Sequence, residues 1–454
     1  MPQTNSHSSS GEIPEVEHPL PAVTAPVPIV SPIDSDYKKP AKSPAVEEKL
    51  ERADFLLVMV MVIAVFILIL NETLLGVALP AIMEDLWVTA STAQWSSTGF
   101  MLTMAVVTPA SGFIISRFSI RHVFVGAMAV FSAGSLVAGL APTFAFLLLG
   151  RVLQAMGTGI IMPLLMTTMM RLVPPSRIGR AMGLIGMVIS AAPALGPTVS
   201  GLILSIGTWH WLFLSVLPIG LIALLVGLRL APSSLPEGGE DQRLDVLSMV
   251  LSTIGFGGLV WGLSSLGGAS SHGGGAPVNP WILVAVSAVV LVIFVARQLQ
   301  LQKTASPFMD LRVFTSFPFV LTVLMSSIAM GVLLGSSVLL PLYTVNVLGM
   351  SSLETGLVLL PGGILAALMS PVVGNLADKF SPRVLVIPGA ILFAAAIWLL
   401  TMFDESTSPL FVLMTYLVIS GVIPFLNTPM MGMGLGSLPQ HLYSYGSSAM
   451  TTVQ

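Results

Sequence analysis

Long apolar runs, separated by short polar connections, fill most of the chain from about residue 55 onward. Each run has about the 20 residues that an α-helix needs to cross the hydrocarbon core of a bilayer. The complete runs cover residues 55–79, 94–115, 122–141, 144–170, 180–204, 211–230, 246–265, 281–298, 317–342, 353–376, 384–402 and 409–434. Another run begins near Tyr443, and the chain stops within it at Gln454. The pattern predicts an all-α membrane protein with about twelve complete transmembrane helices and the start of a thirteenth, C-terminally incomplete.

Composition supports this class and excludes others. Hydrophobic residues make up 54% of the chain and charged residues 9%, whereas a soluble domain carries about 25% charged residues. The net charge of −3 argues against a nucleic-acid partner, because phosphate binding needs a concentrated basic face. There is no cysteine, and the histidines are scattered. Because Walker motifs, hydrolase nucleophile elbows and metal-ligand spacings are also missing, we expect no cofactor, no metal and no enzymatic activity.

The positive charges predict how the chain is oriented. If the N-terminus is cytoplasmic and each run crosses the membrane, all of the 18 lysines and arginines except Arg151 fall in the cytoplasmic loops or at the cytoplasmic helix ends. This is the distribution expected of a multi-pass protein of the cell membrane. The polar segment 1–53, rich in Pro, Ser, Glu and Val, is then a disordered cytoplasmic tail.

The chain also resembles itself at a shift of about 261 residues. Residues 108–112 (Thr-Pro-Ala-Ser-Gly) match 370–374 (Ser-Pro-Val-Val-Gly), and 117–121 (Arg-Phe-Ser-Ile-Arg) match 379–383 (Lys-Phe-Ser-Pro-Arg). Two homologous helix bundles that face one another across a central path are a transporter architecture. The expected parts are the tail 1–53, an N-terminal six-helix bundle 54–230, an inserted helix pair with linkers 231–312, and an incomplete C-terminal bundle 313–454.

Glu72 and Arg151 are the ionisable residues placed deep within the predicted spans. A charge at that depth is unfavourable by at least about 2.5 to 3.5 kcal/mol, so it should face a polar interior and have a partner. We predict a Glu72–Arg151 pair that lines the cavity and, with Asn71, couples transport to protons. The alternative is an ion pair that fixes helix packing. Gln154, Thr73 and Trp95 are assigned to the substrate cavity, although Asn71 and Gln154 could equally satisfy backbone groups.

Two further features indicate gating. The fifth span carries Pro193, Gly196, Pro197 and Gly201, and prolines kink a helix while small residues let another helix approach closely. We interpret it as a gating helix, with ordinary close packing as the alternative. The two repeated loops share basic residues, and the second also has an acid; their gating candidates are Arg117, Arg121, Asp378 and Arg383.

Four segments resemble motifs of the major facilitator superfamily, and within it the fourteen-helix drug:proton antiporters of EmrB/QacA type. Residues 112–121 are similar to the superfamily's G-x-L-a-D-r-x-G-r-k loop, with Ser116 at the aspartate position. Residues 151–157 resemble the R-x-x-Q-G-x-g pattern of the fourth helix, and 183–201 the antiporter signature of the fifth. Residues 70–80 resemble the first-helix motif L-D-x-T-x-V-N-V-A-L-P, and the variant Asn-Glu-Thr looks most like the lincomycin-efflux LmrB branch.

The resemblance implies a proton-coupled exporter of amphipathic drugs, working by alternating access in the lipid bilayer, and we expect a monomer. It also implies about two helices more than the chain supplies. Two alternatives remain open. One is an exporter of a metabolite such as an amino acid or siderophore, and the other is a non-transporting membrane receptor or scaffold.

Overall fold

The computed structural model describes residues 52–232, 245–268, 279–303, 307–350 and 352–454. Nearly all of the predicted tail 1–53, and most of the loops near Arg243 and Gly274, lie outside these residues. All of the described residues belong to one compact unit, Lys49–Gln454.

The described chain is helical, which confirms the predicted fold class. Its α-helices are α1 (Arg52–Asp85), α2 (Ala90–Arg117), α3 (Ile120–Gly139), α4 (Phe144–Leu172), α5 (Ile178–Ile206), α6 (His210–Leu214), α7 (Leu217–Leu230), α8 (Val246–Gly268), α9 (Pro280–Leu301), α10 (Phe317–Asn346), α11 (Ser352–Lys379), α12 (Pro382–Leu400), α13 (Pro409–Gly436) and α14 (Tyr443–Val453). The 3₁₀ turns η1 (Pro175–Arg177), η2 (Leu311–Thr315) and η3 (Gln440–Leu442) precede α5, α10 and α14. Within the described ranges, 12 helices are long and apolar enough to cross a membrane, with α6 and α7 taken together.

Two spans differ in detail from the sequence prediction. The sixth is divided into α6 and α7, and Pro218 lies at the start of α7, where it lacks the N–H that would continue the hydrogen bonding of α6. The first span is longer than predicted, because α1 continues through Pro80 to Asp85. Glu72 therefore lies 13 residues, or about 20 Å, from the end of α1, deeper than the apolar run alone indicated.

Local sequence explains how the helices begin. Side-chain oxygens cap the first turns of α2, α3, α9 and α13, where Thr89, Ser119, Asn279 and Ser408 accept hydrogen bonds from backbone N–H groups. Such caps satisfy donors that have no partner within the helix. Between these ends the apolar runs leave the helix as the favoured conformation, because in lipid each backbone polar group must be paired internally.

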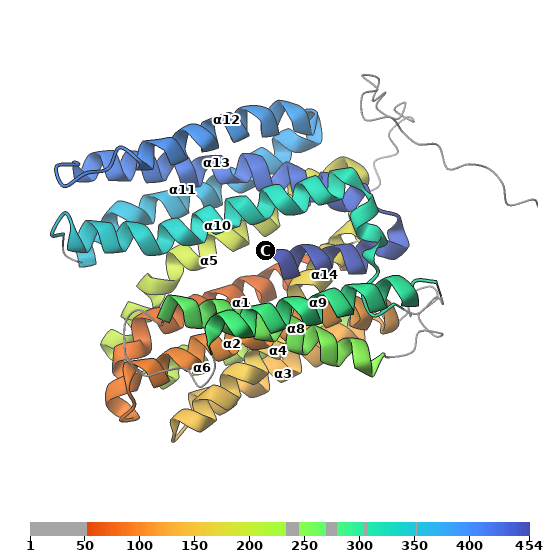
Figure 1. Cartoon of the computed structure of the whole chain (residues 1–454), viewed down its shortest axis with the longest axis horizontal. Coiled ribbons are helices and arrows are strands. Elements are labelled where there is room, and N and C mark those ends of the chain that lie inside the picture. Colours follow the sequence, from red (N-terminus) through yellow and green to blue (C-terminus); the bar gives the residue numbers. More distant parts are fainter. Residues whose placement is uncertain (1–51, 233–244, 269–278, 304–306, 351) are drawn as a thin grey trace, which may run out of the picture. The chain divides into compact units, whose positions relative to one another are not determined.

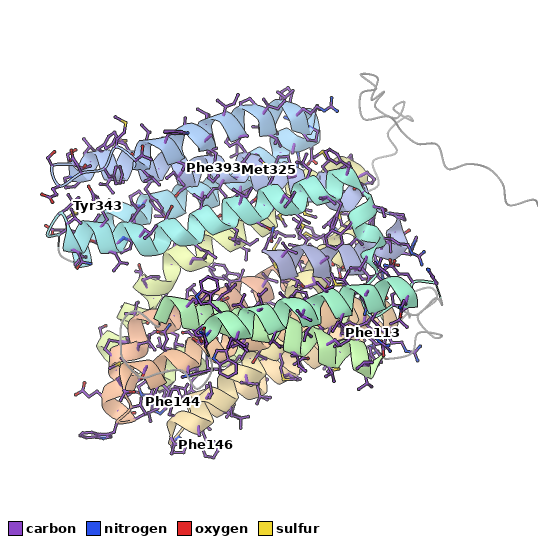
Figure 2. All side chains as sticks on the ribbon, viewed as in Figure 1. Phe113, Phe144, Phe146, Met325, Tyr343 and Phe393 are labelled. Atoms are coloured by element: carbon purple, nitrogen blue, oxygen red, sulfur yellow. The ribbon has the colours of Figure 1, made fainter. Side chains whose placement is uncertain are left out.

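The helices pack into two groups (Figure 1). The first group contains α1 to α5 and α7, and the second contains α10 to α13. The inserted pair α8 and α9 packs against the first group through α2, and α14 packs against α2 and α4. Phe393 is buried in the core of the second group, and Phe113 lies on α2 in the first (Figure 2).

Candidate functional site

Arg151 is the centre of a polar site buried within the first group. It lies in the second turn of α4, and the residue is 1% exposed. Its Nη1 donates to Asn71 Oδ1 at 3.0 Å, and its Nε donates to the carbonyl oxygen of Ser96 at 3.3 Å. The guanidinium carbon also lies 4.1 Å from the centre of the Phe100 ring, a cation–π geometry. These contacts stabilise the positive charge of Arg151 within the helix bundle.

Gln154 extends this site to a fourth helix. Its Oε1 accepts a hydrogen bond of 3.0 Å from Arg151 Nη1, and its Nε2 donates to Ser135 Oγ on α3 at 2.9 Å. Asn71 comes from α1 and Ser96 from α2, so the guanidinium and its partners connect α1, α2, α3 and α4. The sequence predicted Asn71, Arg151 and Gln154 for one site. It gave no indication of the other contacts, because their proximity to Arg151 depends on helix packing; these contacts come from Ser96, Phe100 and Ser135.

Glu72 does not bind Arg151 directly, which corrects the predicted ion pair. Among the described residues, the ion pairs within 4.0 Å join Arg180 to Asp378, Arg297 to Asp245 and Arg312 to Asp310. Successive residues of an α-helix point about 100° apart, so Asn71 faces α4 while the half-buried Glu72 lies on the neighbouring face. The carboxylate is still close enough for its charge to interact with that of Arg151.

Thr73 and Trp95, also assigned to the cavity, lie in two other environments. Thr73 Oγ1 faces α5, 3.5 Å from the carbonyl oxygen of Ala192, and also donates within its own helix. Trp95 packs edge-on against Trp261 of the inserted helix α8, with ring centres 6.3 Å apart. The structure therefore brings neither side chain into the hydrogen-bond network of Arg151.

The predicted gating residues of α5 divide between two faces of the helix. Gly196 is buried, and a Cβ atom placed there would lie 2.8 Å from Thr73 Cβ, so glycine is what allows α5 to approach α1. Pro193, Pro197 and Gly201 are exposed on the other side. One face of α5 thus packs closely on the first group, and the prolines lie away from that contact.

The other end of α5 crosses α11 of the second group. A Cβ atom at Gly183 would lie 2.7 Å from the carbonyl oxygen of Ser370 and 3.1 Å from Gly374 Cα, so the two backbones touch. Asp378 accepts hydrogen bonds from the backbone N–H groups of Gly179 at 2.7 Å and Arg180 at 3.1 Å. A carboxylate of one group therefore caps the helix N-terminus of the other, where the helix dipole favours negative charge. We call this contact the charged crossing.

The equivalent position of the first repeat makes a neutral contact. Ser116 stands at the position that corresponds to Asp378, and its Oγ lies 3.2 Å from Tyr445 Oη on α14. Nearby, Ser448 Oγ donates to the carbonyl oxygen of Thr108 at 2.7 Å, and a Cβ at Gly112 would lie 3.1 Å from Ser448 Cβ. We call the α2–α14 contact the hydroxyl crossing.

The remaining gating candidates are basic residues at helix ends. Arg117 ends α2 and is half-exposed, and the backbone N–H of Arg121 donates to the carbonyl oxygen of Pro232 at 3.2 Å. Arg383 is exposed in the first turn of α12, and none of the described contacts joins it to Asp378. The acid and base of the second loop are therefore not paired; the sequence missed the true partner of Asp378, the N-terminus of α5.

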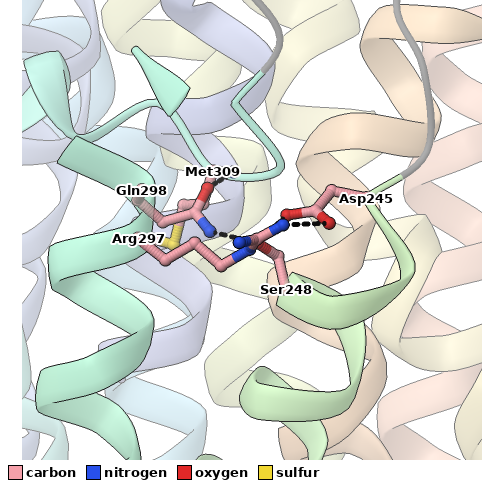
Figure 3. A network of polar contacts seen from close by, with 5 residues as sticks. All are labelled: Asp245, Ser248, Arg297, Gln298 and Met309. Atoms are coloured by element: carbon pink, nitrogen blue, oxygen red, sulfur yellow. Dashed lines mark hydrogen bonds and ion pairs between the residues drawn. The ribbon is translucent and has the colours of Figure 1, made fainter. Parts of the chain in front are cut away.

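A second polar network fastens the inserted helix pair (Figure 3). Arg297 of α9 donates to both oxygens of Asp245, at 2.8 and 2.9 Å. Ser248 also donates to Asp245 and accepts from Gln298 Nε2 at 2.7 Å, and Gln298 Oε1 accepts from the backbone N–H of Met309. The bidentate arginine holds the pKa of Asp245 at about 2, below its ordinary value.

Phe308, which precedes Met309, lies within the first group. Its ring stacks on Phe113 of α2 at 6.1 Å and meets Phe294 of α9 edge-on at 6.4 Å. The linker, α9 and α2 are therefore held together by buried aromatic contacts of Phe308.

The sequence profile of the Major Facilitator Superfamily matches residues 61–454. The chain belongs to the major facilitator superfamily. Members of the superfamily similar to it include the lincomycin resistance protein LmrB of Listeria monocytogenes, which is 40% identical over 389 residues that cover 86% of this chain and 81% of that protein. LmrB of Bacillus subtilis is 38% identical over 396 residues, 87% of this chain and 81% of that protein. The multidrug resistance protein B homolog of Mycobacterium tuberculosis is 29% identical over 389 residues, 85% and 70% of the two chains.

Solved structures of other superfamily members share the fold. The proton:xylose symporter XylE has a TM-score of 0.63 at 14% sequence identity, over 89% of this chain and 86% of that one. The human organic anion transporter MFSD10 has a TM-score of 0.56 at 17% identity, over 89% and 93% of the two chains. At these identities the likeness concerns the fold alone. With the profile match, it shows that the chain is a multi-pass membrane transporter of this superfamily.

Proposed function

We propose that the protein is a proton-coupled antiporter that exports amphipathic drugs from the cell by alternating access. The names of its relatives, lincomycin resistance and multidrug resistance proteins, support a drug rather than a metabolite as substrate. The proposed parts are the N-terminal bundle 54–230, the inserted pair 231–312 and the C-terminal bundle 313–454. The N-terminus is cytoplasmic, and the protein works as a monomer in the cell membrane.

The arrangement of Arg151 and Glu72 is the observation that carries the proposal. Arg151 is buried and held by neutral groups, so its positive charge is fixed in place. Among the described carboxylates, Glu72 alone lies in the middle of a span. A carboxylate that gains and loses a proton beside a fixed cation gives the site two electrostatic states, one neutral in sum and one positive. Intramembrane ionisable groups of this kind are typical of proton pathways.

The two crossings support alternating access. The charged crossing joins α5 to α11 of the second group, and the hydroxyl crossing joins α2 to α14. Both lie near helix ends where basic residues gather, at the end of α2 and the start of α5. If this end is cytoplasmic, the structure corresponds to a state closed toward the cytoplasm. Release of a proton from Glu72 to the cytoplasm and uptake of drug from that side would then require both crossings to open.

The substitution Glu72→Gln tests this function. Glutamine keeps the size and hydrogen-bonding capacity of the side chain but cannot release a proton. We expect the purified variant in nanodiscs to bind lincomycin while losing the proton release that lincomycin causes in the wild type. Proteoliposomes should lose uphill lincomycin transport driven by a pH gradient.

Glu84→Gln is the matched control, because it makes the same change at an exposed position on the same helix. It should release protons and transport like the wild type. Normal proton release from Glu72→Gln would show that Glu72 is not the carrier. A wild type that transports neither lincomycin nor other amphipathic drugs would favour a metabolite exporter or a receptor instead.

A further inference from the structure

A small cavity lies between the two groups of helices, away from Arg151. It is lined by α5 of the first group and by α10, α11 and α13 of the second. Its polar lining residues are Ser190, Ser370, Asn427, Thr428 and Gln454, and the rest of its wall is mostly aliphatic and methionine side chains. None of the side chains of these described residues is ionisable. The side chains of the cavity therefore offer hydrogen bonds without charge.

Two of these polar side chains have unused hydrogen-bonding groups. Thr428 is 1% exposed, and its buried Oγ1 makes no hydrogen bond; the buried Oδ1 of Asn427 also accepts none. Buried polar groups of folded proteins are nearly always paired, so each unpaired group calls for an explanation. Both groups line the same cavity, and a bound ligand would explain both of them.

Gly186 keeps this space open. A Cβ atom at this position would lie 3.2 Å from Ser370 Oγ and 3.2 Å from Thr428 Oγ1, closer than most side-chain contacts. Ser370 Oγ donates to the carbonyl oxygen of Ala366 at 2.8 Å, so its lone pairs remain available toward the cavity. A glycine on α5 thus faces two polar oxygens, which belong to Ser370 and Thr428.

We infer that Asn427, Thr428 and Ser370 form a subsite that hydrogen-bonds a neutral hydroxyl or amide group of the exported molecule. This inference rests on the proposed function and makes it more specific. The unpaired oxygens require a donor from the ligand, and the lining side chains offer hydrogen bonds rather than a charge to recognise it. The apolar remainder of the wall suits the rest of an amphipathic molecule. Because α5 and α13 belong to different groups, a ligand held here contacts both and responds to their relative movement.

Two probes separate the subsite from the rest of the cavity. Lincomycin carries several hydroxyl groups and an amide, whereas tetraphenylphosphonium is an apolar cation without hydrogen-bond donors. We expect Asn427→Leu combined with Thr428→Val to weaken lincomycin binding to the purified full chain at least about tenfold, because one net hydrogen bond has roughly that effect on affinity. Tetraphenylphosphonium binding should change less than about twofold.

Thr168→Val is the matched control for Thr428→Val. Thr168 is also buried with an unpaired Oγ1, but it lies on α4 and does not line the cavity. It should bind both probes like the wild type. If the double variant is unstable, Gly186→Ala provides the second variant, since its methyl group enters the same space and should also weaken lincomycin selectively.

Labelling gives a readout that does not depend on affinity. The chain has no cysteine, so Asn427→Cys introduces a single thiol, and lincomycin should slow its alkylation by a maleimide while tetraphenylphosphonium slows it less. Equal weakening of both probes in the variants, or unchanged lincomycin affinity, would overturn the subsite and leave the proposed function intact. A wild type that binds neither probe would overturn both.

Discussion

The charged crossing and the hydroxyl crossing occupy equivalent places in the two repeats but use different chemistry. At the charged crossing, Asp378 accepts two backbone hydrogen bonds from the first turn of α5. At the hydroxyl crossing, Ser116 lies 3.2 Å from the hydroxyl of Tyr445. Each helix that receives the contact, α5 or α14, is preceded by a proline and a short 3₁₀ turn. The backbone geometry of the repeat is kept, while the charge is present in one copy.

The difference indicates that the two contacts do not resist opening equally. A carboxylate at a helix N-terminus is stabilised by the unpaired N–H groups and by the helix dipole, whereas a pair of hydroxyls exchanges readily for water. The additional ion pair from Arg180 adds little, because its atoms are 3.9 Å apart and the Arg180 side chain is 59% exposed. We therefore expect the charged crossing to control the closed state. Spin labels on Phe118→Cys and Phe380→Cys would measure the population of this state through the distance between them, since both positions are exposed in equivalent loops.

The largest effect should follow from adding one methyl group to the charged crossing. In Gly183→Ala the new Cβ meets two backbone atoms, at 2.7 and 3.1 Å, which cannot move aside. Overpacking of this kind is unfavourable by about 1 to 3 kcal/mol. The population of the closed state, measured by the short distance between the labels, should therefore fall by a factor of about 5 to 150. Gly201→Ala is the control on the same helix, because nothing lies within 4 Å of its Cβ. An unchanged distance distribution for Gly183→Ala would mean that the α5–α11 contact does not limit closure.

A smaller effect is expected from Asp378→Ala, which removes the helix cap. Loss of an N-cap destabilises by about 1 kcal/mol, which corresponds to a fivefold loss of the closed population. Asp378→Asn keeps an acceptor oxygen, so its closed population should fall less than that of Asp378→Ala. Transport by Asp378→Asn should slow, while drug binding persists. If alanine and asparagine act alike, the charge rather than the hydrogen bonds holds the crossing. A loss of drug binding equal to that of transport would assign Asp378 to the fold instead of the gate.

Ser116→Asp should make the hydroxyl crossing resemble the charged one. A carboxylate near the start of α14 gains about 0.3 to 1 kcal/mol from the helix dipole, so the closed population should rise about two- to fivefold. Added to Asp378→Ala, the substitution should restore part of the lost closure. Ser116→Asn carries no charge and is the control. A fall in the closed population would show that the two crossings are not interchangeable.

Asp245→Asn should leave the distance between the labels unchanged, because its network joins α8, α9 and the linker residue Met309 and includes no residue of either crossing. It should instead lower stability. The pKa of Asp245 is lowered to about 2, so its contribution of about 2 kcal/mol is present above the unfolded pKa of about 3.9 and is lost as pH falls toward 2. Thermal unfolding in detergent at pH 7 and pH 3 measures this loss of stability. In Asp245→Asn, the part of the stability difference between pH 7 and pH 3 that comes from Asp245 should disappear. An altered label distance would show that the polar network of Asp245 takes part in the closing movement.

Much of the architecture could be predicted from sequence. Bilayer thickness fixes the length of an apolar run, so the predicted spans differ from the helices mainly at their ends, as in α1, which extends to Asp85. The membrane also makes a buried charge conspicuous, which is why Arg151 and its neighbours Asn71 and Gln154 were found together. Glu72 was correctly placed within the span, although it lies deeper than predicted, and wrongly named as the direct partner, since a rotation of one residue around α1 decides which side chain faces α4.

Sequence by itself determined the helices, their number and the positions of the two repeated loops, because these depend on local composition and on the bilayer. The partners of individual side chains were decided only by tertiary packing. Asp378 has a basic residue five positions later in its own loop, yet it binds the first turn of α5, about 200 residues away in sequence. Thr428 and Gly186 likewise carry no motif and face one another only because α5 passes beside α13. Hydrogen bonds reach about 3 Å, and no local pattern specifies distances of that size between helices that are far apart in the chain.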